Sequence, residues 1–317
     1  MEINHLTTTF KLINGQDINP VDDLSLVVKE GTVVGLVGES GCGKSMTALS
    51  ILSLVPPPGK TTQGEILLNG EDILSLSKKR LSALRGNQIA IIFQDPLTFL
   101  NPVYTIEYQI REAIKIHTNL SNEEAHERIL EDLRKVGMAD PEHVTKSYPF
   151  ELSGGMRQRA MIAMAISCEP QLLIADEPTT ALDVTVQAQI LELLKALVKE
   201  KGISLLLITH DMGIVADICD EVYVMYAGQI VENGSTDEIF YHSAHPYTQA
   251  LLESVLTIEE CKRPIKTIKG VVPDFLNFPK GCRFMPRCSY AKEACMSMPS
   301  FYEVSDNHFC RCVLFDK

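Results

Sequence analysis

The chain has 317 residues, which at roughly 150 residues per domain suggests about two domains. Hydrophobic residues make up 45% and charged residues 22%, a composition that excludes a disordered, collagen-like or coiled-coil chain. With 29 basic and 41 acidic residues the formal charge is -12, which argues against a general nucleic-acid-binding protein. The apolar runs are short and the first residues lack the pattern of a secretory signal, so we expect a cytosolic protein without a membrane span.

The first part of the chain predicts strands alternating with helices. Residues 32–37 form a short apolar run typical of a buried strand, and a helix is expected over residues 46–54, before three consecutive prolines. The Asn69-Gly70 pair predicts a hairpin turn. A further buried strand is expected at residues 89–93.

Residues 96–160 are predicted to be mostly helical, and Ser121 with Glu124 forms a capping box at the start of one helix. Apolar strands are expected at residues 172–175 and 204–208, with a helix between them. Strands that alternate with helices predict an α/β fold with a mainly parallel sheet covered on both faces.

A glycine-rich stretch follows the first buried strand and begins a helix. It reads GESGCGKS over residues 38–45 and fits the phosphate-binding pattern G-x-x-x-x-G-K-[ST]. We expect Lys44 to reach the β- and γ-phosphates and the Ser45 hydroxyl to bind Mg²⁺. A chance glycine-rich turn is the alternative, and the flanking strand and helix argue against it. The expected nucleotide contacts here are Gly38, Glu39, Ser40, Gly41, Cys42, Gly43, Lys44, Ser45 and Met46.

The apolar strand at residues 172–175 is followed by two carboxylates, Asp176 and Glu177. Parallel strands present such residues at the carboxyl edge of the sheet, where ligands bind. We expect Asp176 to hold Mg²⁺ and Glu177 to polarise the attacking water. Taken alone, such a pair is more often a solvated strand end, so the interpretation depends on the phosphate loop upstream.

The stretch LSGGMRQR over residues 152–159 lies between these two motifs, and with it the chain resembles the ATP-binding-cassette (ABC) ATPase family. The resemblance implies that Ser153, Gly154 and Gly155 bind the γ-phosphate of a nucleotide held by a second subunit. A serine hydroxyl and glycine amides at a helix start agree with an anion site. Met156 stands where many members of the family have Gln, and we expect this departure to alter contacts rather than chemistry.

Further landmarks of the family occur in order. The resemblance implies that Gln94 is the Q-loop residue linking Mg²⁺ and water to a helical subdomain, and that Asp183 is the D-loop residue at the dimer interface. It likewise makes His210 the switch histidine that contacts the γ-phosphate. Phe10 is the candidate to stack on adenine, although a single Phe in an early strand is more often part of a core.

The resemblance implies a phosphate-loop ABC ATPase fold with a mainly parallel core sheet, an antiparallel β subdomain and a helical subdomain at about residues 96–160. We expect the ATP-binding domain to span residues 1–250. Residues 251–317 are expected to form a small C-terminal oligopeptide-transporter module that carries a cysteine cluster.

Three stretches resemble the oligopeptide/dipeptide importer subfamily, specifically its D-type ATP-binding subunit: FQDPLTFLNP (93–102), HPYT (245–248) and GCRFMPRC (281–288). Nickel and other small-solute importers share this branch. The resemblance implies an ATP hydrolase at the cytoplasmic face of the inner membrane that powers peptide import. Its implied partners are two permeases, a second ATP-binding subunit (a paralogue rather than a copy), and indirectly an extracytoplasmic solute-binding protein.

The Q-loop region is where the family places the groove for a permease helix. Residues 95–102 combine apolar Leu97, Phe99 and Leu100 with turn-forming residues, which predicts an exposed docking loop. The alternative is that these side chains pack beneath the helical subdomain.

Two other classes of ABC protein fit the sequence less well. A DNA-repair or chromosome-structure ATPase commonly has a long coiled coil or zinc modules before the signature stretch, and neither is present here. A ribosome-associated ABC protein usually has two cassettes in one chain, and this sequence contains one.

Five of the nine cysteines lie between Cys282 and Cys312. The tight C-x2-4-C spacing of structural zinc sites is absent. Irregular spacing suits a [4Fe–4S] cluster, which the subfamily resemblance also implies, with zinc and free thiols as alternatives. The expected ligands are Cys282, Cys288, Cys295 and Cys312. Cys310 is the alternative fourth ligand, because it lies two residues from Cys312.

Overall fold

The computed structural model describes residues 1–180, 182–254, 268 and 270–316. The chain divides into two compact units, a first unit of residues 1–28, 33–74 and 208–317 and a second unit of residues 29–32 and 75–207. Among the described residues, no helix has the length and apolar character needed to cross a membrane.

The first unit contains an antiparallel sheet with the strand order β2-β1-β4-β5. Its strands are β1 (Glu2–Lys11), β2 (Asp17–Val27), β4 (Gly59–Leu68) and β5 (Glu71–Asp72). Asn69 and Gly70 connect β4 to β5 with φ values of 53° and 81°. These left-handed conformations suit a two-residue hairpin turn, so the turn predicted from the Asn-Gly pair is confirmed.

The first unit also contains strands in the order β11-β12-β10-β9-β3. They are β3 (Val33–Val37), β9 (Glu221–Tyr226), β10 (Gln229–Ser235), β11 (Tyr302–Ser305) and β12 (His308–Cys310). Strand β3 is parallel to β9, which the sequence did not predict as a strand, whereas the pairs β9–β10, β10–β12 and β11–β12 are antiparallel. The sheet is therefore mixed, because Ala227 and Gly228 connect β9 to β10 and two residues are too few for a parallel crossover.

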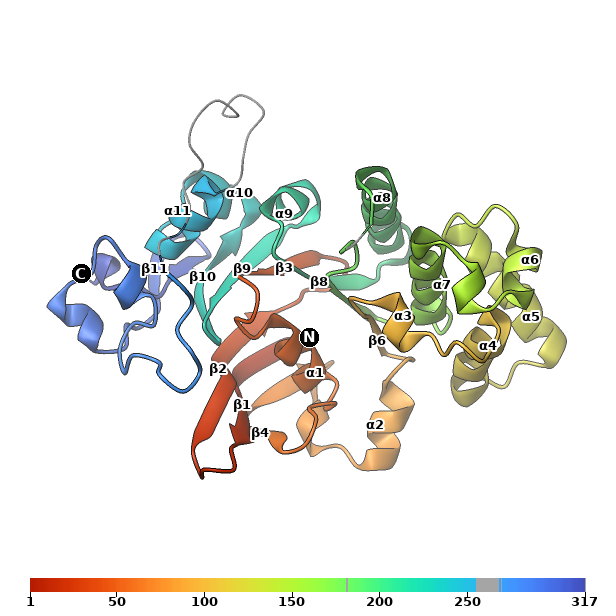
Figure 1. The fold of residues 1–317 in the computed structure, drawn as a ribbon, viewed down its shortest axis with the longest axis horizontal. Helices are drawn as coiled ribbons and strands as arrows, with labels where there is room; N and C mark the ends of the chain where they lie inside the picture. The colour runs from red at the N-terminus through yellow and green to blue at the C-terminus, as the bar shows by residue number, and fades with distance from the viewer. Residues whose placement is uncertain (181, 255–267, 269, 317) are drawn as a thin grey trace. The chain divides into compact units, whose positions relative to one another are not determined.

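Among the described residues, the α-helices of the first unit are α1 (Lys44–Ile51), α9 (Met212–Ile218), α10 (Thr236–Tyr241) and α11 (Pro246–Glu253). Figure 1 shows α9, α10 and α11 along one side of β9 and β10, and the antiparallel sheet on the other side. The helix predicted over residues 46–54 is confirmed as α1, two residues earlier at its start.

Within the first unit, polar contacts join the C-terminal segment to strands β10 and β2. The fully buried carboxylate of Glu232 on β10 accepts hydrogen bonds from the backbone N–H groups of Ala244 and His245. It also accepts one from Nε2 of His308 on β12, at 2.8 Å. Arg311 forms a further ion pair with Asp23 on β2, at 3.0 Å. Glu232 thus connects three separate parts of the chain.

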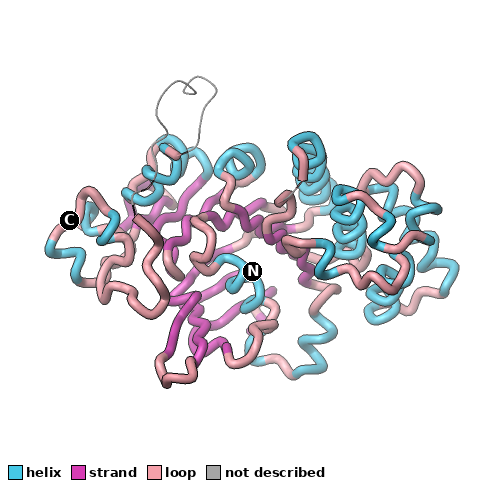
Figure 2. The backbone as a smooth tube through the Cα atoms, viewed as in Figure 1, coloured by secondary structure: helices cyan, strands magenta, loops and turns pink. Residues whose placement is uncertain are grey.

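The second unit combines strands with a group of helices. Strand β6 (Ile89–Ile92) is parallel to β7 (Leu172–Asp176), as predicted, and β8 (Ser204–Thr209), which begins in this unit, follows β7 in the strand order. Figure 2 shows that helix dominates residues 96–166. The helices are α2 (Lys78–Leu84), α3 (Pro96–Phe99), α4 (Ile106–His117), α5 (Asn122–Lys135), α6 (Pro141–Lys146), α7 (Gly154–Ile166) and α8 (Val184–Lys201).

Helices α4, α5, α6 and α7 pack around a shared apolar core in the second unit. Ile114, Ile129, Leu133 and Ile162 in this core have no exposed surface. At the start of α5 both hydrogen bonds of the Ser121–Glu124 capping box are formed, which confirms that prediction.

Candidate nucleotide-binding site

The phosphate loop follows β3 and leads directly into α1. A Cβ atom on Gly38 would lie 2.1 Å from the carbonyl oxygen of Met225, and one on Gly43 would lie 2.1 Å from that of Pro20. Gly43 also has a φ of 113°, which side-chain-bearing residues rarely adopt. The loop therefore requires glycine at these two positions, and it forms a backbone cradle at a helix N-terminus that fits a phosphate group.

Lys44 is buried and its ammonium group points back into the loop. Nζ donates hydrogen bonds to the carbonyl oxygens of Gly38 at 2.8 Å and Glu39 at 3.1 Å. These carbonyls hold the cation inside the loop. The other expected contacts in this loop differ in exposure: Ser40, Gly41 and Ser45 are exposed, Glu39 and Met46 are half-buried, and Cys42 is buried.

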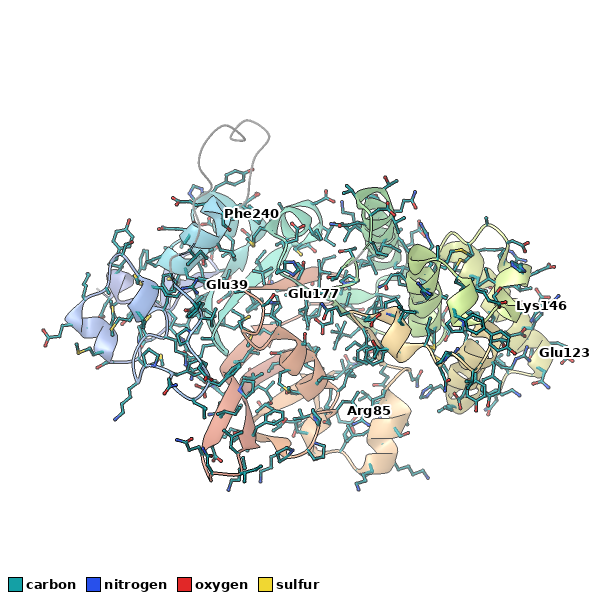
Figure 3. All side chains as sticks on the ribbon, in the orientation of Figure 1. Glu39, Arg85, Glu123, Lys146, Glu177 and Phe240 are labelled. Carbon is teal, nitrogen blue, oxygen red and sulfur yellow. The ribbon has the colours of Figure 1, made fainter. Side chains whose placement is uncertain are left out.

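Glu39 connects the phosphate loop to the C-terminal region of the first unit, and Figure 3 labels its side chain. Its backbone N–H donates to the hydroxyl of Tyr247 on α11 at 2.9 Å. Its carboxylate accepts two hydrogen bonds from Arg287, at 2.7 and 3.0 Å. No role for Arg287 or Tyr247 was predicted from the sequence, although both lie in stretches that resemble the importer subfamily.

The second unit brings Gln94 and Glu177 into contact. Nε2 of Gln94 donates to Oε2 of Glu177 at 2.9 Å, and the hydroxyl of Thr180 donates to the same oxygen at 3.0 Å. Glu177 has a φ of 47°, an uncommon backbone conformation for a residue with a side chain. Asp176 is buried at the end of β7. The two carboxylates thus occupy a strand end, as expected.

The signature stretch begins α7. The Ser153 hydroxyl caps this helix by accepting from the N–H of Met156 at 3.3 Å. A Cβ on Gly155 would lie 2.8 Å from Val186, so glycine permits the close approach of α8. A Cβ on Gly154 would only touch Leu182, at 3.8 Å. Asp183 caps α8, and Ala181, two residues earlier in the chain, lies outside the described residues.

The two remaining expected nucleotide contacts, His210 and Phe10, belong to the first unit. His210 follows β8 and is exposed. Phe10 lies on β1, and a Cβ on Gly59 of β4 would meet its ring at 2.4 Å. The Phe10 ring therefore lies over Gly59.

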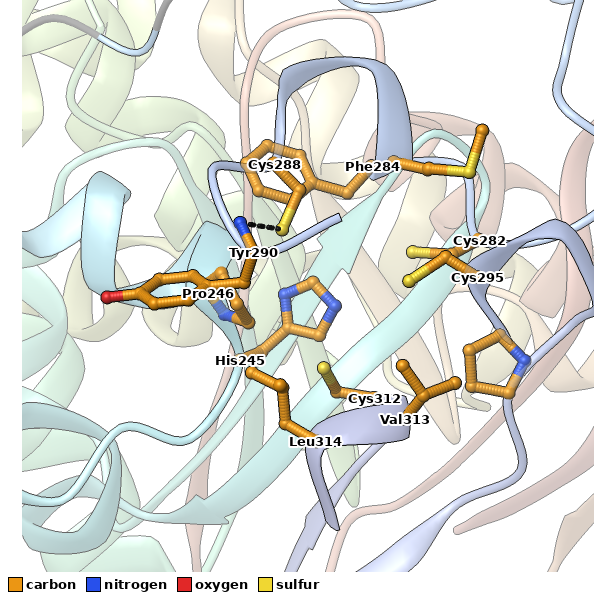
Figure 4. A pocket seen from close by; sticks show the side chains of 12 residues that line it. His245, Pro246, Cys282, Phe284, Cys288, Tyr290, Cys295, Cys312, Val313 and Leu314 are labelled. Carbon is orange, nitrogen blue, oxygen red and sulfur yellow. Dashed lines mark hydrogen bonds between the residues drawn. The ribbon is translucent and has the colours of Figure 1, made fainter. Parts of the chain in front are cut away.

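Four cysteines line one cavity in the C-terminal region, and Figure 4 shows them around the ring of His245. They are Cys282, Cys288, Cys295 and Cys312. Cys282 and Cys295 are brought together by a backbone hydrogen bond of 2.9 Å. A Cβ on Gly281 would lie 2.2 Å from the carbonyl oxygen of Cys295, so this close approach requires glycine.

Among the described residues, no group of three or more His, Cys, Asp or Glu side chains has the arrangement needed to hold a metal ion. Cys310 does not line the cavity, because it lies on β12 and is fully buried. Burial raises the pKa of the Cys282 thiol to about 11, whereas a hydrogen bond from Cys310 lowers the pKa of Cys312 to about 7. Cys261 lies outside the described residues.

His245 is buried beside these thiols. Its Nδ1 accepts a hydrogen bond from the backbone N–H of Tyr247 at 3.0 Å, which leaves Nε2 as the protonated nitrogen. Nε2 is buried and has no hydrogen-bond partner among the described residues. Burial lowers the pKa of His245 to about 4, so the ring is neutral near pH 7.

The predicted docking loop after Gln94 forms one turn of helix, α3, capped by Asp95. Leu97 is 58% exposed and Phe99 is 47% exposed, as expected, but Leu100 is only 3% exposed. The expectation of an exposed Leu100 is therefore wrong, because the helical turn directs this residue inward while Leu97 and Phe99 remain at the surface. The ring of Phe99 stacks on that of Phe93 at 3.5 Å.

Comparison with known families assigns most of the chain. The family model described as "ABC transporter" matches residues 21–180, and the one described as "Oligopeptide/dipeptide transporter, C-terminal region" matches residues 231–295. The oligopeptide transport ATP-binding protein AppD of Bacillus subtilis is 47% identical over 100% of this chain and 97% of its own length. The dipeptide transport ATP-binding protein DppD of Haemophilus influenzae is 50% identical over 87% of this chain and 83% of its own.

Solved structures give the same assignment for the fold. The dimeric structure of MJ0796, a bacterial ABC transporter cassette, has a TM-score of 0.67 and 29% identity, covering 74% of this chain and 98% of its own. A post-hydrolysis state of the same cassette, bound to ADP and phosphate, has a TM-score of 0.67 and 28% identity, with the same coverage. This chain therefore has the ABC ATPase fold, α/β with mixed sheets, and belongs to the ATP-binding subunits of oligopeptide/dipeptide ABC transporters.

Proposed function

We propose that this chain binds and hydrolyses ATP to power the import of di- or oligopeptides through a membrane ABC transporter. The observation that carries the proposal is the combination of a phosphate-loop cradle with a C-terminal region matched by the oligopeptide/dipeptide family over residues 231–295. AppD and DppD, which match along most of the chain, are named for oligopeptide and dipeptide transport respectively.

In this proposal the phosphate loop binds the ATP phosphates through its backbone N–H groups, and Lys44 turns from the loop carbonyls towards the β- and γ-phosphates. Glu177 accepts a proton from the attacking water, and its hydrogen bond from Gln94 orients the carboxylate for that role. His210 contacts the γ-phosphate, and Phe10 stacks on adenine. Ser153, Gly154 and Gly155 contact the nucleotide held by the partner subunit, while Asp183 lies at the subunit interface.

Mg²⁺ would be held by Ser45, Gln94 and Asp176, whose hydroxyl, amide and carboxylate oxygens are the ligand types this cation prefers. It would neutralise charge on the phosphates during transfer.

The proposed partners are two membrane permeases and a second ATP-binding subunit, a paralogue rather than a copy, with a solute-binding protein acting indirectly. The chain would then lie at the cytoplasmic face of the membrane as a peripheral subunit. We assign residues 1–250 to the ATP-binding domain, with its antiparallel β subdomain and with a helical subdomain at about 96–160. Residues 251–317 are assigned to the cysteine-rich C-terminal module.

We further propose that Cys282, Cys288, Cys295 and Cys312 bind a [4Fe–4S] cluster. A [4Fe–4S] cluster takes four thiolates, one at each iron, and four thiols line this cavity, whereas the tight C-x2-4-C spacing of structural zinc sites is absent from the sequence. The unpartnered Nε2–H of His245 lies among the residues that line this cavity, where a cluster sulfur would provide its acceptor. Such a cluster would supply an electron-accepting, oxygen-sensitive group.

Transport by living cells tests the main proposal. In cells that depend on this subunit, Lys44→Ala should abolish uptake of a labelled tripeptide, while uptake of an amino acid by an unrelated carrier continues. Loss of nickel uptake with normal peptide uptake would favour a nickel importer. Normal uptake of both solutes would contradict the proposal.

A further inference from the structure

The phosphate loop and the C-terminal region meet at one ion pair, between Glu39 and Arg287. Nη1 of Arg287 donates to Oε2 of Glu39 at 2.7 Å, and Nη2 donates to Oε1 at 3.0 Å. The Arg287 side chain is only 4% exposed, and that of Glu39 is 27% exposed. A two-point contact between planar groups determines orientation as well as distance, and this one is largely removed from water.

Arg287 is itself held in place by aromatic side chains. Nη1 also donates to the hydroxyl of Tyr226 at 3.3 Å, and the guanidinium carbon lies 5.8 Å from the centre of that ring. Tyr226 packs against Tyr247 at 4.6 Å and against Phe284 at 5.2 Å between ring centres. Because these rings restrict the arginine, its donor groups point at Glu39 before any nucleotide binds.

Glu39 transmits this contact to the lysine that is expected to bind phosphate. Its carbonyl oxygen accepts from Nζ of Lys44 at 3.1 Å, and its N–H donates to Tyr247 at 2.9 Å. A single residue of the loop therefore contacts the C-terminal region through its side chain and its N–H group, and Lys44 through its carbonyl.

The charge of Glu39 gives the contact a second effect. A carboxylate in a loop that binds a triphosphate repels the ligand, and the repulsion is stronger where water is partly excluded. Arg287 neutralises this carboxylate and holds it towards the C-terminal region. Loss of the arginine would leave a free negative charge beside the ligand and a less ordered loop.

We propose that Arg287 is a positioning residue for nucleotide binding, which makes full ATP affinity depend on the C-terminal segment being folded against the phosphate loop. This inference rests on the proposed ATP-binding function. It assigns to the segment around residues 284–288 a role that does not require the cysteines to hold a metal.

The test measures Mg-ATP binding by the full-length chain. Arg287→Gln should raise the dissociation constant about tenfold, and Arg287→Lys about threefold, because lysine keeps the charge but not the two-point contact. In the assembled transporter the KM for ATP should rise with the dissociation constant, while kcat stays within about twofold, because Arg287 does not touch the reacting atoms.

The control is Arg311→Gln. Like Arg287, Arg311 is a largely buried arginine that directly precedes a cysteine of the cavity, Cys312. Its ion-pair partner is Asp23, which is not part of the phosphate loop. The Arg311→Gln variant should lower the melting temperature about as much as Arg287→Gln does, and it should leave the affinity for ATP unchanged. Equal losses of affinity in the two variants would show a general structural effect and overturn the inference.

A double-mutant cycle of Glu39 and Arg287 tests whether the arginine acts through its ion pair with Glu39 or through its packing alone. In a Glu39→Gln background, Arg287→Gln should change the dissociation constant by no more than about twofold, because the partner charge is already absent. A full tenfold loss in that background would contradict the inference. If Arg287→Gln does not fold, Arg287→Lys replaces it in the cycle. Its roughly threefold loss of affinity in the wild-type background should then disappear in the Glu39→Gln background.

The wild-type chain distinguishes failure of the inference from failure of the proposed function. A wild type that binds no ATP would contradict both. If the wild type binds ATP and Arg287→Gln binds it with the same affinity, only the positioning role is contradicted.

Discussion

The side-chain amide of Gln94 donates a hydrogen bond of 2.9 Å to the carboxylate of Glu177, although 83 positions separate the two residues in the chain. One residue follows β6 and the other follows β7, and these strands are parallel neighbours. Parallel pairing brings both strand ends to the same edge, so the proposed water-orienting amide and the proposed base meet there. Gln94 is followed directly by Asp95, the N-cap of helix α3, so this contact links Glu177 to the start of that helix.

Replacing Glu177 with Gln should slow ATP hydrolysis by about 10²- to 10⁴-fold, because the variant lacks the carboxylate that accepts the proton. ATP binding should persist, since the side chain keeps its size, and the ATP-bound subunits should accumulate as a stable dimer. Steady-state phosphate release and size-exclusion chromatography measure the two effects. Glu192→Gln, an exposed glutamate on α8 in the same unit, is the control and should behave as wild type. Near-normal hydrolysis by Glu177→Gln would reject the assignment.

The cavity thiols predict which substitutions remove iron. Protein purified without oxygen should be brown and contain iron and sulfide in comparable amounts. Cys312→Ser should lose most of this iron, because Cys312 lines the cavity, whereas Cys310→Ser should retain it, because Cys310 lies on β12 and is not among the lining residues. Chemical analysis of iron and sulfide checks both variants. Retention by Cys312→Ser and loss by Cys310→Ser would make Cys310 the fourth ligand, and colourless protein with bound zinc would reject the cluster.

The exposed part of α3 predicts a docking surface for a permease. Leu97→Glu and Phe99→Glu should each release the chain from membranes while ATP binding stays intact, because both side chains are at the surface and a charge there opposes burial in an apolar interface. Leu100→Glu should instead destabilise the fold by several kcal/mol, because this residue is buried. Membrane sedimentation and thermal unfolding separate the outcomes. Normal membrane association of Leu97→Glu and Phe99→Glu would contradict the docking surface.

The cap of this short helix should not respond to physiological pH. Hydrogen bonds from the Thr98 hydroxyl and the Leu97 N–H hold the pKa of Asp95 below its usual value of 3.8. A carboxyl group with a lowered pKa stabilises the fold above its unfolded pKa, and this contribution is lost as the pH falls through the folded value. Asp95 therefore stays ionised from about pH 6 to 8, and its contribution to the stability of α3 should not change over this range. An NMR titration of its carboxyl carbon measures the pKa.

The Glu232 side chain should contribute several kcal/mol to the free energy of unfolding. Glu232→Ala removes the acceptor for two backbone N–H groups and for His308, all of them buried, and should cost about 3–5 kcal/mol. Urea unfolding of the full-length chain measures this loss. Glu303→Ala, an exposed glutamate on β11, is the control and should stay within about 0.5 kcal/mol of wild type. Equal effects of the two substitutions would contradict the role of Glu232.

The same contact predicts a pH dependence. The hydrogen bond to Glu232 raises the pKa of His308 above its usual value of 6.5. A histidine with a raised pKa stabilises the fold fully below its unfolded pKa, and this contribution is lost as the pH rises through the folded value. The difference in unfolding free energy between wild type and His308→Gln should therefore be largest near pH 6 and decrease at higher pH. A constant difference from pH 6 to 9 would show that His308 is not charged in the folded state.

The sequence alone was sufficient for features that depend on a few adjacent residues. The phosphate loop, the Asn69-Gly70 hairpin turn and the Ser121–Glu124 capping box are each set by backbone conformation and hydrogen bonds within a short stretch. The buried strands at residues 89–93 and 172–175 were also predictable, because a strand covered on both faces must be apolar along its length.

Only the tertiary structure decided which distant residues meet. Arg287 lies 248 positions from Glu39, and nothing in the local pattern of either residue indicates the other. Leu100 and Leu97 have the same hydrophobicity, and one is buried and the other exposed because a single helical turn directs them to different sides. Cys310 and Cys312 are likewise distinguished by the path of β12 and not by their spacing. These outcomes depend on packing between elements far apart in the chain, which short-range patterns do not encode.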